Sequence, residues 1–164
     1  MPATQTSKTQ DILRQADQLA AKADTPEELM QGICTLLNRE MLKYNWVGFY
    51  LLEETRGEPM LVLGPFVGAM TPHTRIPLNQ GICGAAASSG ETVVVDDVNN
   101  DPRYLACSLE TKSEIVVPVF ANGKVVGELD IDSHFPSAFT GEDRTVVEHC
   151  AKVVGNFMEK SASA

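Results

Sequence analysis

Apolar residues recur at helical spacing near both ends of the chain. Residues 9–22 carry one such stripe, and a second helix is expected from Thr25, a good helix N-cap, to about residue 43. A third helix should begin at residues 140–143, and its stripe consists of Val146, Val147, Cys150, Val153, Val154 and Phe157. The pattern therefore predicts amphipathic helices at both ends of the chain.

The middle of the chain has the β-branched and aromatic content of strands separated by turns. A helix of small residues is expected among them at residues 81–88. The predicted strands cover residues 45–53, 60–66, 74–77, 92–95, 115–121 and 124–131. Consecutive strands flanked by terminal helices indicate an α+β fold with a mostly antiparallel central sheet of about six strands.

Acidic residues occupy every second position at the end of the last predicted strand. Because side chains alternate along a strand, Glu128, Asp130 and Asp132 must share one face. Leu129 and Ile131 lie on the other face. Since carboxylates do not face a dry core without partners, the spacing predicts a polar pocket or rim on one side of the sheet.

The position of Glu114 relative to these acids depends on the hairpin turn between the last two strands. A two-residue turn, Asn122-Gly123, would point Glu114 away from the acids. A three-residue loop, residues 121–123, would place it on their face and opposite Asp130. We predict the three-residue loop, with Gly123 in a left-handed conformation.

Length and composition indicate one domain, since 164 residues with 43% apolar content can form a sizeable core. We expect an N-terminal helical extension at residues 1–24 and the domain itself at residues 25–160. The formal charge of −9 argues against binding to nucleic acid or an anionic membrane. Without an apolar run near the roughly 20 residues of a membrane span, or a signal sequence, we expect a soluble, cytoplasmic protein.

The four cysteines form no CxxC pair and no metal-ligand spacing, but their surroundings differ. Cys34 and Cys150 belong to helical apolar stripes and are expected to be core thiols. Cys83 stands near the start of the small-residue helix, where the helix dipole should lower its pKa. Cys107 lies in residues 96–108, a polar stretch typical of a surface loop. Cys83 and Cys107 are therefore the candidates for reactivity.

Two candidate thiols together with a row of acids favour thiol redox chemistry. A cysteine hydrolase would need a histidine beside its nucleophile, and none of His73, His134 and His149 has a recognisable partner. A metal site built from Asp130, Asp132 and His73 fits no standard spacing. We therefore expect neither a metal nor a cofactor.

Several short motifs lie within about residues 25–158. They are Asn45-Trp46-Val47-Gly48-Phe49-Tyr50, Gly64-Pro65-Phe66, Arg75-Ile76-Pro77, Gly81-Ile82-Cys83-Gly84, Ala106-Cys107, Ser113-Glu114-Ile115-Val116-Val117-Pro118 and Leu129-Asp130-Ile131-Asp132-Ser133. In kind and in order, they resemble the motifs of the free methionine-R-sulfoxide reductases, single-domain enzymes on the GAF fold.

The resemblance implies reduction of free L-methionine (R)-S-oxide to L-methionine, with thioredoxin restoring the enzyme. Cys107 would attack the sulfoxide sulfur and become a sulfenic acid, and Cys83 would close a disulfide with it. Asp130 would protonate the sulfoxide oxygen, because a carboxyl in a crowded acidic site can have its pKa raised enough to donate.

The same resemblance assigns the remaining site positions to substrate binding. Glu114 and Asp132 would bind the polar end of the substrate, and Trp46 and Tyr50 would wall its S-methyl group. An acidic pocket suits the α-ammonium group that only a free amino acid presents. Selection against methionine within a protein chain would follow.

One position departs from the family. Many members have another cysteine ten residues before Cys83, where this chain has His73. The recycling disulfide would then form directly between Cys83 and Cys107.

Two other interpretations stay open. The chain could be a non-catalytic GAF module that binds a small ligand and signals, since fold does not fix function. It could also be an interaction protein whose terminal helices assemble into a dimer bundle. In either case, we expect a homodimer.

Overall fold

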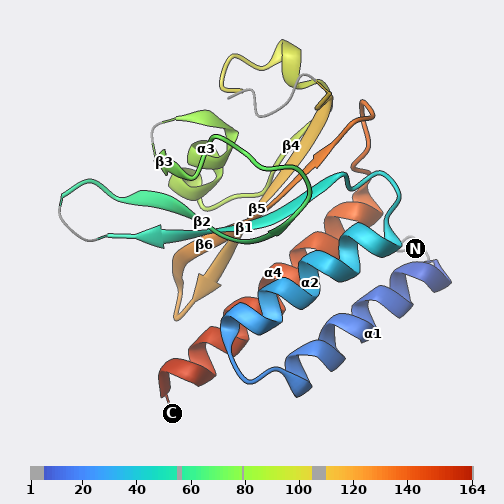
Figure 1. Ribbon diagram of the computed structural model, residues 1–164, viewed down its shortest axis with the longest axis vertical. Coiled ribbons are helices and arrows are strands. Elements are labelled where there is room, and N and C mark those ends of the chain that lie inside the picture. Colours follow the sequence, from blue (N-terminus) through green and yellow to red (C-terminus); the bar gives the residue numbers. More distant parts are fainter. Residues whose placement is uncertain (1–5, 55–56, 79, 105–109, 164) are drawn as a thin grey trace.

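The computed structural model describes residues 6–54, 57–78, 80–104 and 110–163. A six-stranded sheet lies at its centre, in the order β3-β2-β1-β6-β5-β4, with every neighbouring pair antiparallel (Figure 1). The strands are β1 (Trp46–Glu53), β2 (Met60–Val67), β3 (Arg75–Pro77), β4 (Val93–Val95), β5 (Ser113–Ala121) and β6 (Lys124–Ser133). The predicted α+β fold is confirmed.

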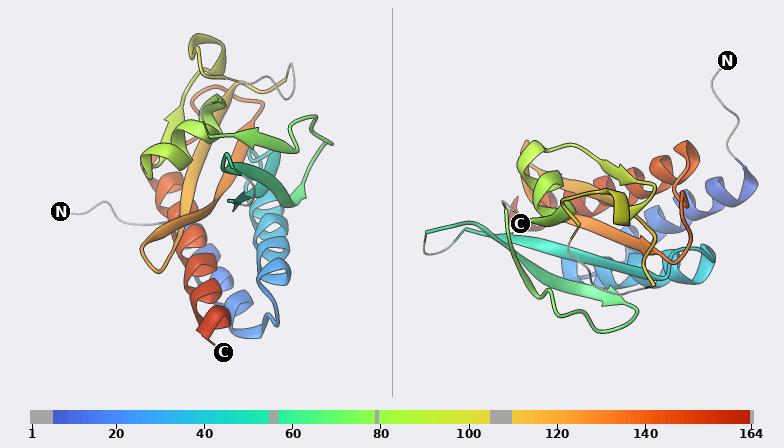
Figure 2. Two further views of the ribbon diagram at one scale, coloured as in Figure 1. Left: turned by 90° about the vertical axis from the view of Figure 1, so that its left-hand side faces the viewer. Right: turned by 90° about the horizontal axis from the view of Figure 1, so that it is seen from above.

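Helices cover both faces of the sheet. α2 (Pro26–Glu40) and α4 (Gly141–Ser163) pack on one face, and α1 (Ser7–Lys22) packs on both of them as an outer layer. α3 (Gly81–Ser89) packs against β5 and β6 from the opposite face, and the short η1 (Val98–Asn100) follows β4. Figure 2 shows the three long helices together on one side of the sheet. None of the helices in the part of the chain that the structure describes combines the length and the apolar character of a membrane span.

Side-chain caps fix the starts of α2 and α4, as the sequence predicts. The Glu28 N–H donates to Thr25 Oγ1 at 3.1 Å at the start of α2. At the start of α4, the Asp143 N–H donates to Thr140 Oγ1 at 3.3 Å, and the Thr140 N–H donates to Asp143 Oδ2 at 2.9 Å. This reciprocal pair satisfies two backbone groups that the helix itself leaves open.

Alternation along β6 separates a large apolar core from a smaller one. Leu129 and Ile131 join the large core under α2 and α4. Cys34 and Cys150 are fully buried there, which confirms both as core thiols. The smaller cluster lies on the opposite face and includes Ile82 of α3. Burial of apolar surface on the face that α2 and α4 cover is the main force that holds β6 in place.

The hairpin turn between β5 and β6 is not the predicted one. Ala121 pairs with Lys124, so the turn is the two-residue Asn122-Gly123. Asn122 and Gly123 have φ angles of 53° and 77°, as the common two-residue hairpin turn with two left-handed positions requires. The prediction of a three-residue loop was therefore wrong.

A β-bulge restores the side-chain direction that the two-residue turn alone would have reversed. The register shifts between residues 119 and 120, and Val126 is left as an extra residue in β6. Glu114 consequently pairs with Asp132 rather than with the predicted Asp130. It still lies on the face of the acids, as expected, but opposite a different partner.

Helix α4 approaches the hairpin closely at Gly155. A Cβ at this position would lie 2.1 Å from the Phe120 carbonyl oxygen, which belongs to the backbone. We predict that Gly155→Ala lowers the free energy of unfolding by about 1–3 kcal/mol, although alanine is the better helix former.

Gly141→Ala is the matched control, because a Cβ at Gly141, also in α4, would meet no atom within 4 Å. Urea unfolding of the two variants measures the difference. Equal stabilities of the two variants would contradict the close approach.

Candidate active site

A small cavity lies where α3 meets the acid-bearing face of the sheet. Its volume is about 20 Å³, which is room for about one water molecule. The residues that line it are Tyr50, His73, Ile76, Gly81, Ile82, Cys83, Glu114 and Asp130. The cavity therefore brings together one candidate thiol, two of the predicted carboxyl groups and one predicted aromatic residue.

Four carboxyl groups are buried on this face and are called the acidic cluster below. β6 supplies Glu128, Asp130 and Asp132 at alternate positions, and β5 supplies Glu114. Glu128 is 0% exposed, and the other three are at most 5% exposed. The predicted polar pocket is thus an enclosed cluster rather than a solvated rim.

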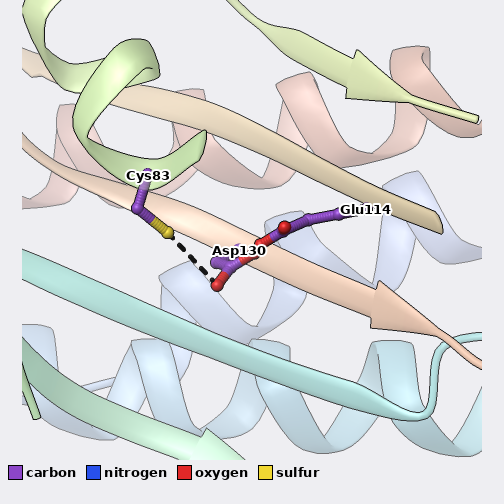
Figure 3. A group of neighbouring side chains, drawn as sticks. All are labelled: Cys83, Glu114 and Asp130. Carbon is purple, nitrogen blue, oxygen red and sulfur yellow. Dashed lines mark hydrogen bonds between the residues drawn. The ribbon is translucent and has the colours of Figure 1, made fainter. Parts of the chain in front are cut away.

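Cys83, in the first turn of α3, points toward Asp130 (Figure 3). Its thiol donates a hydrogen bond of 3.3 Å to Asp130 Oδ2. Burial, followed by the charge of Asp130 and its acidic neighbours, raises the pKa of Cys83 well above its ordinary value. Our expectation of a thiolate favoured by the helix dipole was wrong, because burial and the neighbouring acids outweigh the dipole. Cys83 is a neutral thiol at rest.

Burial is also the main cause that raises the pKa of each carboxyl in the acidic cluster. Glu114 lies within hydrogen-bonding reach of both Asp130 and Asp132. Two carboxyl groups form a hydrogen bond with each other only when one of them carries a proton. The cluster therefore holds protons in the folded state, and Glu114, Asp130 and Asp132 titrate together.

Several oxygens of the acidic cluster have no hydrogen-bond partner in the part of the chain that the structure describes. They are Asp130 Oδ1, Asp132 Oδ1 and both carboxyl oxygens of Glu128. Buried polar atoms in folded proteins normally have a partner. Acceptors of this kind favour a ligand that brings a positive charge or N–H groups.

Two aromatic residues of β1, Trp46 and Tyr50, pair directly with acids of β6 across the sheet. The Trp46 Nε1–H donates to the Ala69 carbonyl oxygen at 3.0 Å, and the Tyr50 hydroxyl donates to the His73 carbonyl oxygen at 2.7 Å. These hydrogen bonds hold both rings by their polar ends. The apolar faces are therefore fixed beside the acidic cluster.

The only donor atoms grouped closely enough to bind a cation, within 4.8 Å of one another among the described residues, come from Cys83, Glu114 and Asp130. His73 does not belong to this group, although it was part of the metal site considered from the sequence. Cys107, the predicted nucleophile, lies outside the described residues.

Residues 25–157 match the GAF domain family. A free methionine-R-sulfoxide reductase of Escherichia coli is 34% identical over 148 residues, which cover 88% of this chain and 87% of that protein. This chain belongs to the free methionine-R-sulfoxide reductase family.

Two further proteins of that name support the assignment. The free methionine-R-sulfoxide reductase of Saccharomyces cerevisiae is 44% identical over 111 residues, 67% of this chain and 61% of the yeast protein. The X-ray structure of the Neisseria meningitidis enzyme in complex with its substrate has a TM-score of 0.88 at 34% identity, and the match covers 98% of this chain and 95% of that one. The resemblance seen in the sequence motifs is confirmed.

Glu128 is the buried acid of this reductase-family chain to which the sequence analysis gave no role. Its alternation with Asp130 along β6 predicted the face of the sheet on which it lies. Its full burial depends on α3, which packs over β6, and on Tyr50 of the neighbouring strand β1, with which it pairs. No local sequence pattern indicates either contact.

The acidic cluster should make the stability of the protein depend on pH. Burial raises the pKa of Glu128 well above 4.5, so the folded protein keeps a proton that the unfolded chain would release. The stability contributed by this group is full below its unfolded pKa and is lost as the pH rises through its folded pKa. We predict that Glu128→Gln removes this loss of stability at rising pH, because glutamine does not ionise.

The variant should therefore gain stability over the unchanged protein as the pH rises above the ordinary range of a glutamate, with a limiting slope of about 1.4 kcal/mol per pH unit. Urea unfolding at several pH values measures this gain. Parallel stability profiles for the two proteins would show that Glu128 does not titrate in this way.

Proposed function

We propose that this protein reduces free L-methionine (R)-S-oxide to L-methionine by thiol chemistry at Cys107 and Cys83. The observation that carries the proposal is the enclosed acidic cluster that surrounds the Cys83 thiol, with Asp130 hydrogen-bonded to it. Membership of the reductase family supports the same reaction. The substrate is a free amino acid because a buried acidic site recognises an ammonium group.

Asp132 and Glu114 are the proposed binding groups for that ammonium. The two residues pair across β5 and β6, and Asp132 Oδ1 has no hydrogen-bond partner among the described residues. A buried carboxylate gains a charge-assisted hydrogen bond when an ammonium group arrives. Trp46 and Tyr50 supply the apolar wall for the S-methyl group.

In the first half-reaction, the Cys107 thiolate attacks the sulfoxide sulfur. The sulfur–oxygen bond of the substrate breaks, the oxygen passes to Cys107 as a sulfenic acid, and methionine leaves as a thioether. Asp130 supplies the proton that this oxygen needs. Its buried carboxyl suits that role because burial raises its pKa.

In the second half-reaction, the Cys83 sulfur attacks the sulfenic sulfur of Cys107. The disulfide forms as the S–O bond breaks, and the hydroxyl leaves as water. Asp130 relays the thiol proton to that hydroxyl through the 3.3 Å hydrogen bond it already accepts from Cys83. A dithiol reductant then returns both cysteines to thiols.

Thioredoxin is the proposed reductant, and the proposed setting is a homodimer in the cytoplasm. The vicinal thiols of thioredoxin match a single Cys83–Cys107 disulfide, since one dithiol reduces one disulfide. Residues 1–24 would act as a helical extension of the domain at residues 25–160. α1 packs on both α2 and α4, as such an extension would.

Replacement of each cysteine should separate the two half-reactions. Cys107→Ser should abolish methionine formation because the nucleophile is lost. Cys83→Ser should still release one methionine per chain, and the sulfenic acid of Cys107 should persist because no disulfide can close. Methionine is quantified in a single turnover, and intact mass reports the oxidation state of the protein.

The unchanged protein should lose two hydrogens in the same assay and gain a Cys83–Cys107 link. An unchanged mass with no methionine released would reject the reductase. Tight binding of a small ligand that survives replacement of both cysteines would instead support a non-catalytic GAF module.

Selection for a free amino acid should depend on the ammonium group. N-acetylation of methionine-R-sulfoxide removes that charge and should lower kcat/KM by about 100-fold, the loss expected when a buried charged group is left unpaired. The methyl ester of the same sulfoxide keeps the ammonium and is the matched control, with a smaller loss. Equal losses for the two derivatives would contradict recognition of the ammonium.

A further inference from the structure

Glu128 is the most deeply buried member of the acidic cluster. It is 0% exposed, and neither carboxyl oxygen has a hydrogen-bond partner among the described residues. Its neighbours across the sheet are Tyr50 on β1 and Pro118 on β5. On its own face, it stands beside Asp130, and its carboxyl group lies close to the Cys83 sulfur.

A carboxyl group in this position is costly to bury, because its two oxygens have no hydrogen-bond partner among the described residues. An apolar side chain of the same volume would remove the cost of burying two polar oxygens without partners. Buried polar groups that lack partners call for a specific explanation. Among the residues that the structure describes, the reactive atom close to Glu128 is the Cys83 sulfur.

Opening of the Cys83–Cys107 disulfide leaves an unfavourable negative charge on the Cys83 sulfur. The S–S electron pair returns to the Cys83 sulfur, which then stands as a thiolate among buried carboxyl groups. Burial and the charge of Asp130 disfavour that anion strongly. A thiol that is a poor anion is a poor leaving group, so the sulfur needs a proton as the bond breaks.

Asp130 has no proton of its own to return to Cys83 at this stage of the proposed cycle. In the first half-reaction, it gives its proton to the sulfoxide oxygen, and in the second it only relays the Cys83 proton, so it is left as a carboxylate. The hydrogen bond that it accepts from Cys83 exists in the reduced protein alone. Glu128 lies close to the same sulfur, and its carboxyl oxygens have no hydrogen-bond partner among the described residues.

We propose that Glu128 is the acid that returns a proton to Cys83 when a dithiol opens the Cys83–Cys107 disulfide. This inference rests on the proposed function, which supplies the disulfide. A thiolate of the dithiol attacks the Cys107 sulfur, the S–S bond breaks, and its electron pair passes to Cys83. The O–H bond of Glu128 breaks, its proton forms the S–H bond of Cys83, and a carboxylate remains.

The remaining steps balance the electrons and the protons of the cycle. The second thiol of the dithiol displaces Cys107 from the mixed disulfide, so the dithiol is oxidised and both cysteines are reduced. Glu128 regains its proton from the solvent, which receives the protons of the dithiol. The residue therefore acts as an acid for recycling and takes no part in transferring the sulfoxide oxygen.

The test compares the two halves of the cycle in Glu128→Gln, which keeps the shape of the side chain and removes the acid. Disulfide opening by dithiothreitol is followed in the pre-oxidised protein by rapid alkylation and mass spectrometry. Methionine release is measured separately in one turnover of the reduced protein. We expect disulfide opening to slow at least about tenfold more than methionine release, since a general acid contributes at least that much.

Two controls separate chemistry from folding. Glu58→Gln makes the same chemical change at an exposed position and should slow neither step. Glu128→Asp keeps an acid with a shorter reach and should recover part of the lost rate. Thermal unfolding of Glu128→Gln checks that the variant is folded under the assay conditions.

Disulfide opening as fast as in the unchanged protein would overturn the role of Glu128. An equal slowing of both steps would also overturn it, because a general loss of structure affects both. The disulfide can also be formed with diamide, without the sulfoxide. No methionine release, with normal disulfide chemistry after diamide, would overturn the proposed function alone.

Discussion

The site depends on one constraint, which is that β6 has to bury both of its faces. Leu129 and Ile131 are fixed in the large core beneath α2 and α4. Because side chains alternate, the acids between and beside them must point to the other face, where α3 and β1 exclude water. Apolar burial on one face thus offsets the cost of enclosing carboxyl groups on the other.

Enclosure changes what these acids can do. A carboxyl group at the surface is ionised at neutral pH and has no proton to give. Here, burial raises the pKa of every member of the acidic cluster, and carboxyl pairs within hydrogen-bonding reach share protons. The same groups can therefore bind an ammonium when ionised and donate a proton when neutral. Both abilities suit a zwitterionic substrate whose reaction consumes protons.

Periodicity alone predicted most of the fold. The helices at both ends, the strands of the sheet and the common face of Glu128, Asp130 and Asp132 follow from helical and strand periods that the large core enforces. The hairpin was harder to predict. Val125 and Val126 are both apolar, so the pattern could not show that one of them is an extra residue that changes the register.

The electrostatic state of the site could not be predicted from local sequence. A helix N-terminus favours a thiolate, and for Cys83 that local rule failed because residues distant in the chain bury it among acids. The environment of Glu128 depends in the same way on β1 and α3, which lie far from it in the sequence. Family motifs pointed to Asp130 and Glu114 as candidate site residues, whereas the full burial of Glu128 became visible only in three dimensions.

The central claim is that the protons of the acidic cluster are linked to the ammonium of the substrate. Calorimetric titration of the Cys107→Ser variant with free L-methionine (R)-S-oxide, in two buffers of different ionisation enthalpy, tests it most directly. An incoming ammonium lowers the pKa of the buried acids, so the account predicts a net release of protons at neutral pH. Binding with the same enthalpy in both buffers would contradict it.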